Sequence, residues 1–296
     1  MLRLAHRILS QKPRVFPVHG MSEADEDRLV DDCISVIGRH AHIVIADNVF
    51  SYLTNTGRES FTGLDFPSCR PPFDYMWIEW QADTSFIFGT SGHEERLSQY
   101  GTLVVSCKCG ESQFDELKRV LPVGDGVEVF CMFFSFACLD GNPTFMATKS
   151  VLAVNADGTP AGSHTFTKGP FADEASAEMC FPPALMAISF MNCKNVVKQD
   201  ATETEGPANK WLRRMKQPKL RYHVLNIEPM KQVLRTEGGV EQNGLKKALH
   251  ICRGHFATYT DDKPLFGRVT GTFWKPSHVR GSIEQGAVVK DYAVKV

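Results

Sequence analysis

Arginine and histidine occur as two closely spaced pairs near the end of the chain. Arg253 and His255 are separated by one residue, and the second pair, His278 and Arg280, repeats that spacing in the reverse order. A guanidinium group presents a planar fork of donors that matches phosphate oxygens. Two imidazoles, which titrate near neutral pH, can serve as general base and general acid. We therefore expect a phosphate site, with His255 and His278 as catalytic residues and Arg253 and Arg280 as phosphate-binding residues.

The period of a β-strand predicts how the first of these pairs is presented. If residues 249–260 form one strand, Arg253, His255 and Tyr259 point to the same face. An antiparallel neighbour carrying the second pair would bring two guanidinium groups and two imidazoles together. Tyr259 and Trp274 are the expected stacking residues, because aromatic rings stack on nucleobases. Metal-free cleavage needs the 2′-hydroxyl as nucleophile, so RNA is expected in preference to DNA.

Two other interpretations of this region stay open. Arginine and histidine at strand ends often bind carbonyl groups or carboxylates, and Asp261 and Asp262 are close enough in sequence to be such partners. Pro276 favours an unpaired loop over residues 275–281, which would remove the facing geometry. The region is therefore structural, binds an anion or nucleic acid without chemistry, or is catalytic.

Charge is distributed unevenly along the chain. The whole chain has 33 basic and 34 acidic residues, yet residues 207–296 have 17 basic and 7 acidic residues, a formal charge of +10, which leaves −11 on residues 1–206. A basic region commonly faces phosphates. The alternative is that the two parts neutralise each other within one fold. Within the basic region, the residues expected to contact phosphate also include Lys210, Arg213 and Arg214.

The pattern of elements predicts an α+β fold with a mainly antiparallel β-sheet, a few flanking helices and a basic C-terminal β region. Runs of β-branched and aromatic residues fill residues 75–154. Helices are expected over 22–38, begun by Ser22 as a capping residue, and over 183–194, begun at Pro183. We expect an acidic α+β region, 1–200, and a basic region, 207–296, packed on it as one large domain.

An acidic residue lies between tryptophans in the predicted sheet. Trp77 and Glu79 share a face of the strand predicted around them. A carboxyl group among aromatic rings would have a raised pKa through desolvation. Packing of the tryptophans in the core, with Glu79 pointing outward, is the preferred interpretation.

The first 21 residues contain four basic residues and no acidic residue. A transit peptide has a similar charge pattern, but serine is scarce and two prolines interrupt the segment. We expect this segment to dock on the fold.

Composition excludes several classes of protein. With 43% hydrophobic and 23% charged residues, the chain is typical of a globular protein. The longest nearly unbroken apolar run, 129–139, is shorter than the roughly 20 residues of a membrane helix, so no membrane association is expected. Nine cysteines, an odd number, indicate reduced thiols and a cytoplasmic location. Cys107 and Cys109 are a weak match to a zinc motif, and no metal or cofactor is expected.

The arginine and histidine pairs belong to a longer set of motifs, RGHF…Y…PLFG…G…W…HVRGS, preceded by FMNCKNV, LRYHVLNI and PPFDYMWIEW. Together these motifs resemble a group of uncharacterised proteins encoded by phages, prophages and other mobile elements, over most of the chain. The group brings no established activity, so the resemblance implies a phage or mobile-element setting. The matching positions are Arg253, Gly254, His255, Trp274, His278, Arg280 and Gly281.

These observations lead to one functional prediction and one alternative. The prediction is a phage- or mobile-element-type protein whose basic C-terminal region binds nucleic acid, as a metal-independent ribonuclease in its catalytic form. The alternative is a non-catalytic inhibitor or structural protein whose acidic N-terminal part binds a host protein. The sequence does not predict an oligomeric state.

Overall fold

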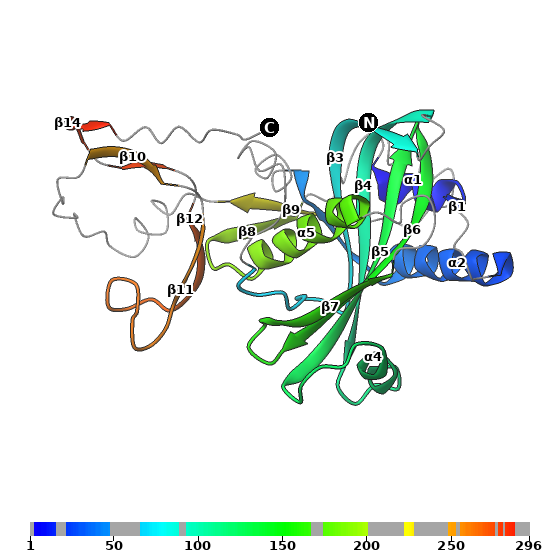
Figure 1. Ribbon diagram of the computed structural model, residues 1–296, viewed down its shortest axis with the longest axis horizontal. Coiled ribbons are helices and arrows are strands. Elements are labelled where there is room, and N and C mark those ends of the chain that lie inside the picture. Colours follow the sequence, from blue (N-terminus) through cyan, green and yellow to red (C-terminus); the bar gives the residue numbers. More distant parts are fainter. Residues whose placement is uncertain are drawn as a thin grey trace. The chain divides into compact units, whose positions relative to one another are not determined.

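The chain forms two compact units (Figure 1). Unit 1 comprises residues 1–192 and 198–226, and unit 2 comprises residues 193–197 and 227–296. The expected α+β fold with a mainly antiparallel sheet is confirmed. This computed structural model of the 296-residue chain describes residues 3–15, 22–47, 66–88, 93–166, 174–200, 222–227, 248–252, 255–275, 278–280 and 282–287.

A nine-stranded sheet has the order β1-β6-β5-β4-β3-β2-β9-β8, with β7 paired to β6. Its long strands β3, β4, β5 and β6 pair antiparallel, which confirms the β-rich region expected over 75–154. β2 pairs parallel with both β3 and β9. The strands are β1 (Arg14–Val15), β2 (His42–Ile45), β3 (Tyr75–Phe88), β4 (His93–Lys108), β5 (Val127–Leu139), β6 (Asn142–Asn155), β7 (Pro160–Phe166), β8 (Val196–Asp200) and β9 (Tyr222–Ile227).

The pairing of β9 with β2 places the strand around residues 222–227 in the large sheet. The division between the units therefore falls after Asn226, further along the chain than the boundary expected near residues 200–207.

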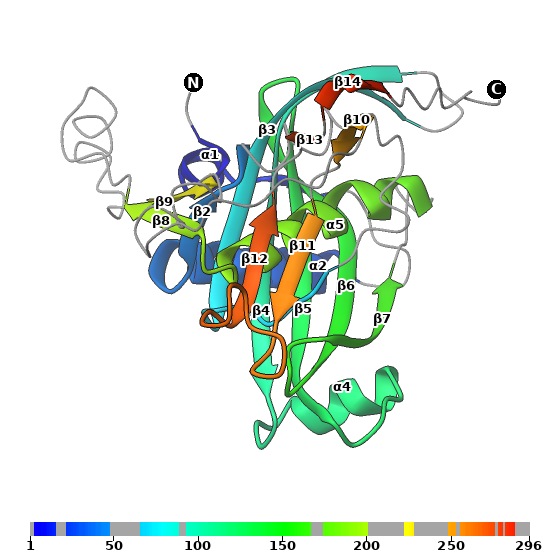
Figure 2. The same cartoon turned by 90° about the vertical axis from the view of Figure 1, so that its left-hand side faces the viewer.

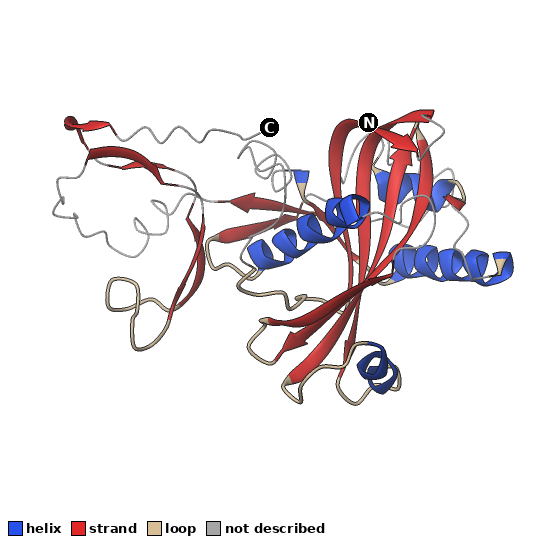
Figure 3. Cartoon of the chain, viewed as in Figure 1, coloured by secondary structure: helices blue, strands red, loops and turns tan. Residues whose placement is uncertain are grey.

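Helices lie on both sides of the long strands: α1 and α2 on one side and α5 on the other (Figure 3). As predicted, Ser22 caps α2, and its side chain accepts a hydrogen bond from the main-chain N–H of Asp25 at 3.2 Å. The prediction that a helix begins at Pro183 is wrong, because α5 continues through Pro182 and Pro183. Burial of residues 182–191 offsets the hydrogen bonds that the prolines cannot donate. The helices are α1 (Leu4–Ser10), α2 (Glu23–Arg39), α4 (Phe114–Val120) and α5 (Glu174–Met191).

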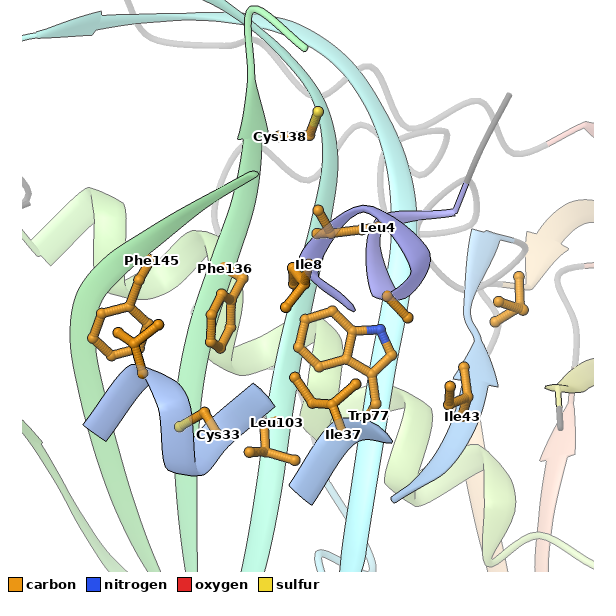
Figure 4. Close-up of a cluster of buried hydrophobic side chains, with 13 residues drawn as sticks. Leu4, Ile8, Cys33, Ile37, Ile43, Trp77, Leu103, Phe136, Cys138 and Phe145 are labelled. Carbon is orange, nitrogen blue, oxygen red and sulfur yellow. The ribbon is translucent and has the colours of Figure 1, made fainter. Parts of the chain in front are cut away.

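The main hydrophobic core of unit 1 lies between α1, α2 and one face of the sheet (Figure 4). Trp77 is at its centre and packs edge-on against Phe136, with ring centroids 5.5 Å apart. Gly101 on β4 lies against the Trp77 ring, and a Cβ at this position would lie 2.6 Å from Cη2, so only glycine fits. The other large side chains of this core are Leu4, Ile8, Ile37, Ile43, Leu103 and Phe145.

Glu79 is buried beside this core, with 1% of its surface exposed. Its Oε2 accepts hydrogen bonds from Nε1 of Trp77 at 2.7 Å and from the main-chain N–H of Ala5, in the first turn of α1, at 2.9 Å. Arg3 lies 3.9 Å from Oε1 and also binds Asp47 at 2.9 Å. The expectation that Glu79 points outward is wrong, because these donors hold it inside. As expected for a carboxyl group among aromatic rings, burial raises the pKa of Glu79.

Unit 2 contains a three-stranded sheet, with the order β13-β10-β14, and a hairpin of β11 and β12 (Figure 2). The strand expected over 249–260 contains β10 and β11, and residues 253 and 254 between them lie outside the described residues. The segment expected to be an unpaired loop around Pro276 contains β13, which pairs antiparallel with β10. The strands are β10 (Ala248–Cys252), β11 (His255–Tyr259), β12 (Gly271–Lys275), β13 (His278–Arg280) and β14 (Ser282–Ala287).

The raised pKa of Glu79 predicts a pH-dependent effect of Glu79→Gln on stability. The unfolded chain releases this proton near pH 4.3, and the folded chain releases it at a higher pH. The stability contributed by the protonated group is thus complete below about pH 4.3 and is lost as pH rises through the folded pKa. Glutamine keeps an acceptor for Trp77 and Ala5 but does not titrate.

The free energy of unfolding of the variant, measured with urea relative to the parent protein, should therefore increase from pH 4 to pH 7. An equal difference at the two pH values would show that Glu79 does not titrate with a raised pKa.

Candidate nucleic-acid interface

One face of the β11–β12 hairpin carries a histidine, a lysine and a tyrosine. His255 and Lys275 are register partners, and Tyr259 lies on the same face, opposite Gly271. The Lys275 ammonium is 5.2 Å from the centroid of the Tyr259 ring, within the range of a cation–π contact. His255 is exposed, whereas Lys275 and Tyr259 are half-buried. This face therefore presents a cation and an imidazole beside an aromatic ring, and it also carries the buried Phe273.

The opposite face of the hairpin is a packing face. Trp274 is 2% exposed, and its ring lies edge-on to Phe256, with centroids 4.8 Å apart. Thr258 and Thr272 are joined by a hydroxyl–hydroxyl hydrogen bond of 3.0 Å. A nucleobase has no access to the face of Trp274 in this arrangement. Of the two expected stacking residues, Trp274 is buried and Tyr259 is half-buried.

Asn195 fixes β12 from a distant part of the sequence. Its side-chain amide donates to the main-chain carbonyl of Trp274 at 2.8 Å, and its carbonyl oxygen accepts from the Trp274 N–H at 2.9 Å. The main-chain N–H of Lys194 donates to the carbonyl of Thr272 at 3.0 Å. Asn195 is itself buried, with 2% exposed. These bonds satisfy main-chain groups of β12 that β11 does not reach.

The two predicted arginine and histidine pairs belong to separate ladders. His278 is the register partner of Cys252, and Arg280 that of His250, whereas His255 faces Lys275. The second pair thus lies on an antiparallel neighbour of β10, and His255 is not the register partner of His278. Arg253, Gly254, Gly281, Lys210, Arg213, Arg214 and the side chains of His278 and Arg280 lie outside the described residues.

His255 and His278 nevertheless lie at the same end of the hairpin. Cys252, the register partner of His278, precedes His255 by three residues. Lys275, the register partner of His255, likewise precedes His278 by three residues. Three residues span at most about 11 Å, and paired Cα atoms are about 5 Å apart, so the Cα atoms of the two histidines are within about 16 Å.

The charge split follows the division into units, but it is smaller than the split at residue 207. Unit 2 contains 12 basic and 7 acidic residues, a formal charge of +5, and unit 1 carries −6. The exposed Asp261 and Asp262 lie in the loop between β11 and β12. Unit 2 therefore carries a net charge that attracts an anion.

Metal binding and thiol chemistry are the other possibilities among the described residues. Within them, no cluster of three or more histidine, cysteine or acidic side chains is placed to hold a metal ion. Cys107 is buried, which raises its pKa to about 11, while Cys109 is exposed. The seven cysteines with described side chains are free thiols. In the same part of the chain, no helix has the length and apolar character needed to cross a membrane.

Lys275 and Asn195 were not identified as site residues from the sequence. Lys275 becomes the partner of His255 only when the hairpin register is known, and the loop 260–270 is too long for a tight-turn motif to indicate it. Asn195 lies within the FMNCKNV motif, which was noted only for its resemblance.

Comparisons of the chain with protein-family models, with curated proteins and with solved structures found no match. The β11–β12 face is the best candidate because it alone combines a predicted catalytic residue, a predicted stacking residue and a cation among the described site residues. Its function is inferred from the chemistry of these side chains.

The two hydrogen bonds between Asn195 and Trp274 predict a strong effect of Asn195→Ala on the stability of unit 2. Alanine leaves the buried N–H and carbonyl of Trp274 without this partner, and each such group costs about 1–3 kcal/mol. The opening free energy measured by hydrogen exchange at the Trp274 amide should fall by about 2–4 kcal/mol.

Lys194→Ala is the matched control, because the hydrogen bond to Thr272 uses the main chain of Lys194 and is kept, while only an exposed side chain that lies against Gly271 is removed. This variant should remain within about 0.5 kcal/mol of the parent protein. If the Trp274 amide exchanges as slowly in Asn195→Ala as in the parent protein, the two hydrogen bonds from Asn195 do not stabilise β12.

Proposed function

We propose that the protein binds single-stranded RNA through the β11–β12 face of unit 2. The observation that supports this most directly is the exposed His255 opposite Lys275, with the Lys275 ammonium 5.2 Å from the Tyr259 ring. A cation beside an aromatic ring matches the alternation of phosphate and base along a single strand. The formal charge of +5 on unit 2 supports the same class of ligand.

A narrower part of the proposal is metal-independent cleavage of the bound strand. One histidine, His255 or His278, removes the proton from the 2′-hydroxyl, whose oxygen attacks phosphorus. The bond from phosphorus to the 5′-oxygen breaks, and the other histidine protonates that oxygen. The products are a 2′,3′-cyclic phosphate and a free 5′-hydroxyl. The upper limit of about 16 Å between the two Cα atoms in unit 2 is compatible with this pairing.

The biological setting is proposed from the sequence. The resemblance to proteins of phages, prophages and other mobile elements supports a role in such an element. The free thiols among the described cysteines support action in the cytoplasm.

Removal of one charge tests the binding proposal. Lys275→Gln should weaken binding to a single-stranded RNA oligonucleotide in fluorescence anisotropy. It should also lower the magnitude of the slope of log affinity against log salt by about 0.7, the contribution of one phosphate contact. Lys118→Gln is the matched control, since Lys118 is half-buried on α4 in unit 1, as Lys275 is in unit 2, and forms an ion pair with Asp125.

An equal loss in both variants would contradict the assigned surface. A stable protein partner, together with no RNA binding at low salt, would instead favour the alternative of a protein inhibitor or structural protein.

Histidine substitutions test the cleavage proposal. His255→Ala and His278→Ala should each reduce cleavage of single-stranded RNA at least about 100-fold, because each removes one proton-transfer group. The measurement is the appearance of cyclic-phosphate ends with a chelator present. Cleavage that persists in both variants, or is absent from the parent protein, would refute the catalytic part and leave the binding proposal intact.

A further inference from the structure

The loop between β11 and β12 ends in a tight turn that exposes a phenylalanine. The main-chain N–H of Arg268 donates to the carbonyl of Leu265 at 3.1 Å, closing a four-residue turn. Leu265 and Val269 are joined on either side of this turn by hydrogen bonds of 2.7 and 3.0 Å. Phe266, the second residue of the turn, is 44% exposed. The turn therefore holds an apolar ring at the surface by main-chain bonds on both sides.

The conformation of Phe266 is unfavourable for its residue type. Its φ is +53°, and the next residue, Gly267, has φ +73°. Two successive positive φ angles define the turn type that asparagine or aspartate followed by glycine normally forms. A bulky L-residue rarely adopts this region, because its Cβ crowds the backbone. The local fold thus keeps an exposed phenylalanine where asparagine would be more stable, which indicates a role for the ring.

The charges around this turn favour an aromatic contact over a contact with phosphate. Lys263 and Arg268 are exposed on the loop, but Asp261 and Asp262 are exposed there as well. The two signs offset each other, so the loop as a whole attracts phosphate weakly. What the loop offers is an aromatic face, and such a face stacks on nucleobases of any sequence.

We propose that Phe266 stacks on an unpaired base of the strand held by the β11–β12 face. The inference rests on the proposed RNA binding and adds the selection of unpaired over base-paired RNA. In a duplex the bases are already stacked, so a ring at a loop tip gains little. Phe266 and Lys275 then have separate roles: Lys275 supplies a salt-dependent contact, and Phe266 supplies a salt-independent one.

Phe266→Asn separates this role from a structural one. Asparagine suits the positive φ, so the melting temperature of the variant should rise. Its affinity for a single-stranded RNA 12-mer should nevertheless fall about tenfold, the loss expected for one stacking contact. The salt slope should be unchanged, and affinity for duplex RNA should stay as in the parent protein.

Two further variants make the test specific. Phe266→Trp should retain affinity, and its added fluorescence should be quenched by single-stranded RNA. Val120→Asn, which removes another exposed apolar side chain, 51% exposed in unit 1, should bind RNA as the parent protein does.

The outcomes distinguish this inference from the proposal on which it rests. If the parent protein binds single-stranded RNA and Phe266→Asn binds it equally well, the role of Phe266 is refuted while RNA binding stands. Equal affinity of the parent protein for single-stranded and duplex RNA also refutes it. If the parent protein binds no RNA, both are refuted.

Discussion

The architecture of unit 1 depends on a carboxylate that is buried beside Trp77. Glu79 accepts from the indole of Trp77 and from the first turn of α1, so one oxygen joins the centre of the sheet to the N-terminal helix. Leu4 and Ile8 of α1 then cover the core. Burial of a carboxyl group carries a desolvation cost, seen as the raised pKa, and the donated hydrogen bonds offset it. The position of α1 is thus coupled to the core by the hydrogen bond to Glu79 and by the packing of Leu4 and Ile8.

In the described part of unit 2, hydrogen bonds from Asn195 hold the β11–β12 hairpin. The side-chain amide of Asn195 pairs with both main-chain groups of Trp274, as a neighbouring strand would. This fixes the packed face of the hairpin. The opposite face carries His255, Lys275 and Tyr259 together with Phe273, which is 1% exposed and lies edge-on to the Tyr259 ring. A rigid hairpin with one anchored face is a suitable support for recognition.

Local patterns in the sequence predicted those features that depend on local forces. The cap at Ser22 and the alternation of residues in β3 to β6 follow from neighbours in the chain. In the site, the same two-residue period placed His255 and Tyr259 on one face. The remaining features depend on distant partners. Glu79 was expected outside because its donor in α1 is 74 residues away, and burial of Trp274 cannot be distinguished from exposure by residue type.

Unit 2 is built from two segments that are separate in the chain, and this affects its folding during synthesis and its transfer by recombination. Residues 193–197 belong to it although residues 198–226 belong to unit 1, so the chain passes between the units three times. Asn195 leaves the ribosome 79 residues before its partner Trp274, and this part of unit 2 forms only after Trp274 has been synthesised. The two stretches of unit 2 are separated by residues 198–226 of unit 1, so transfer of residues 227–296 alone would leave Trp274 without Asn195.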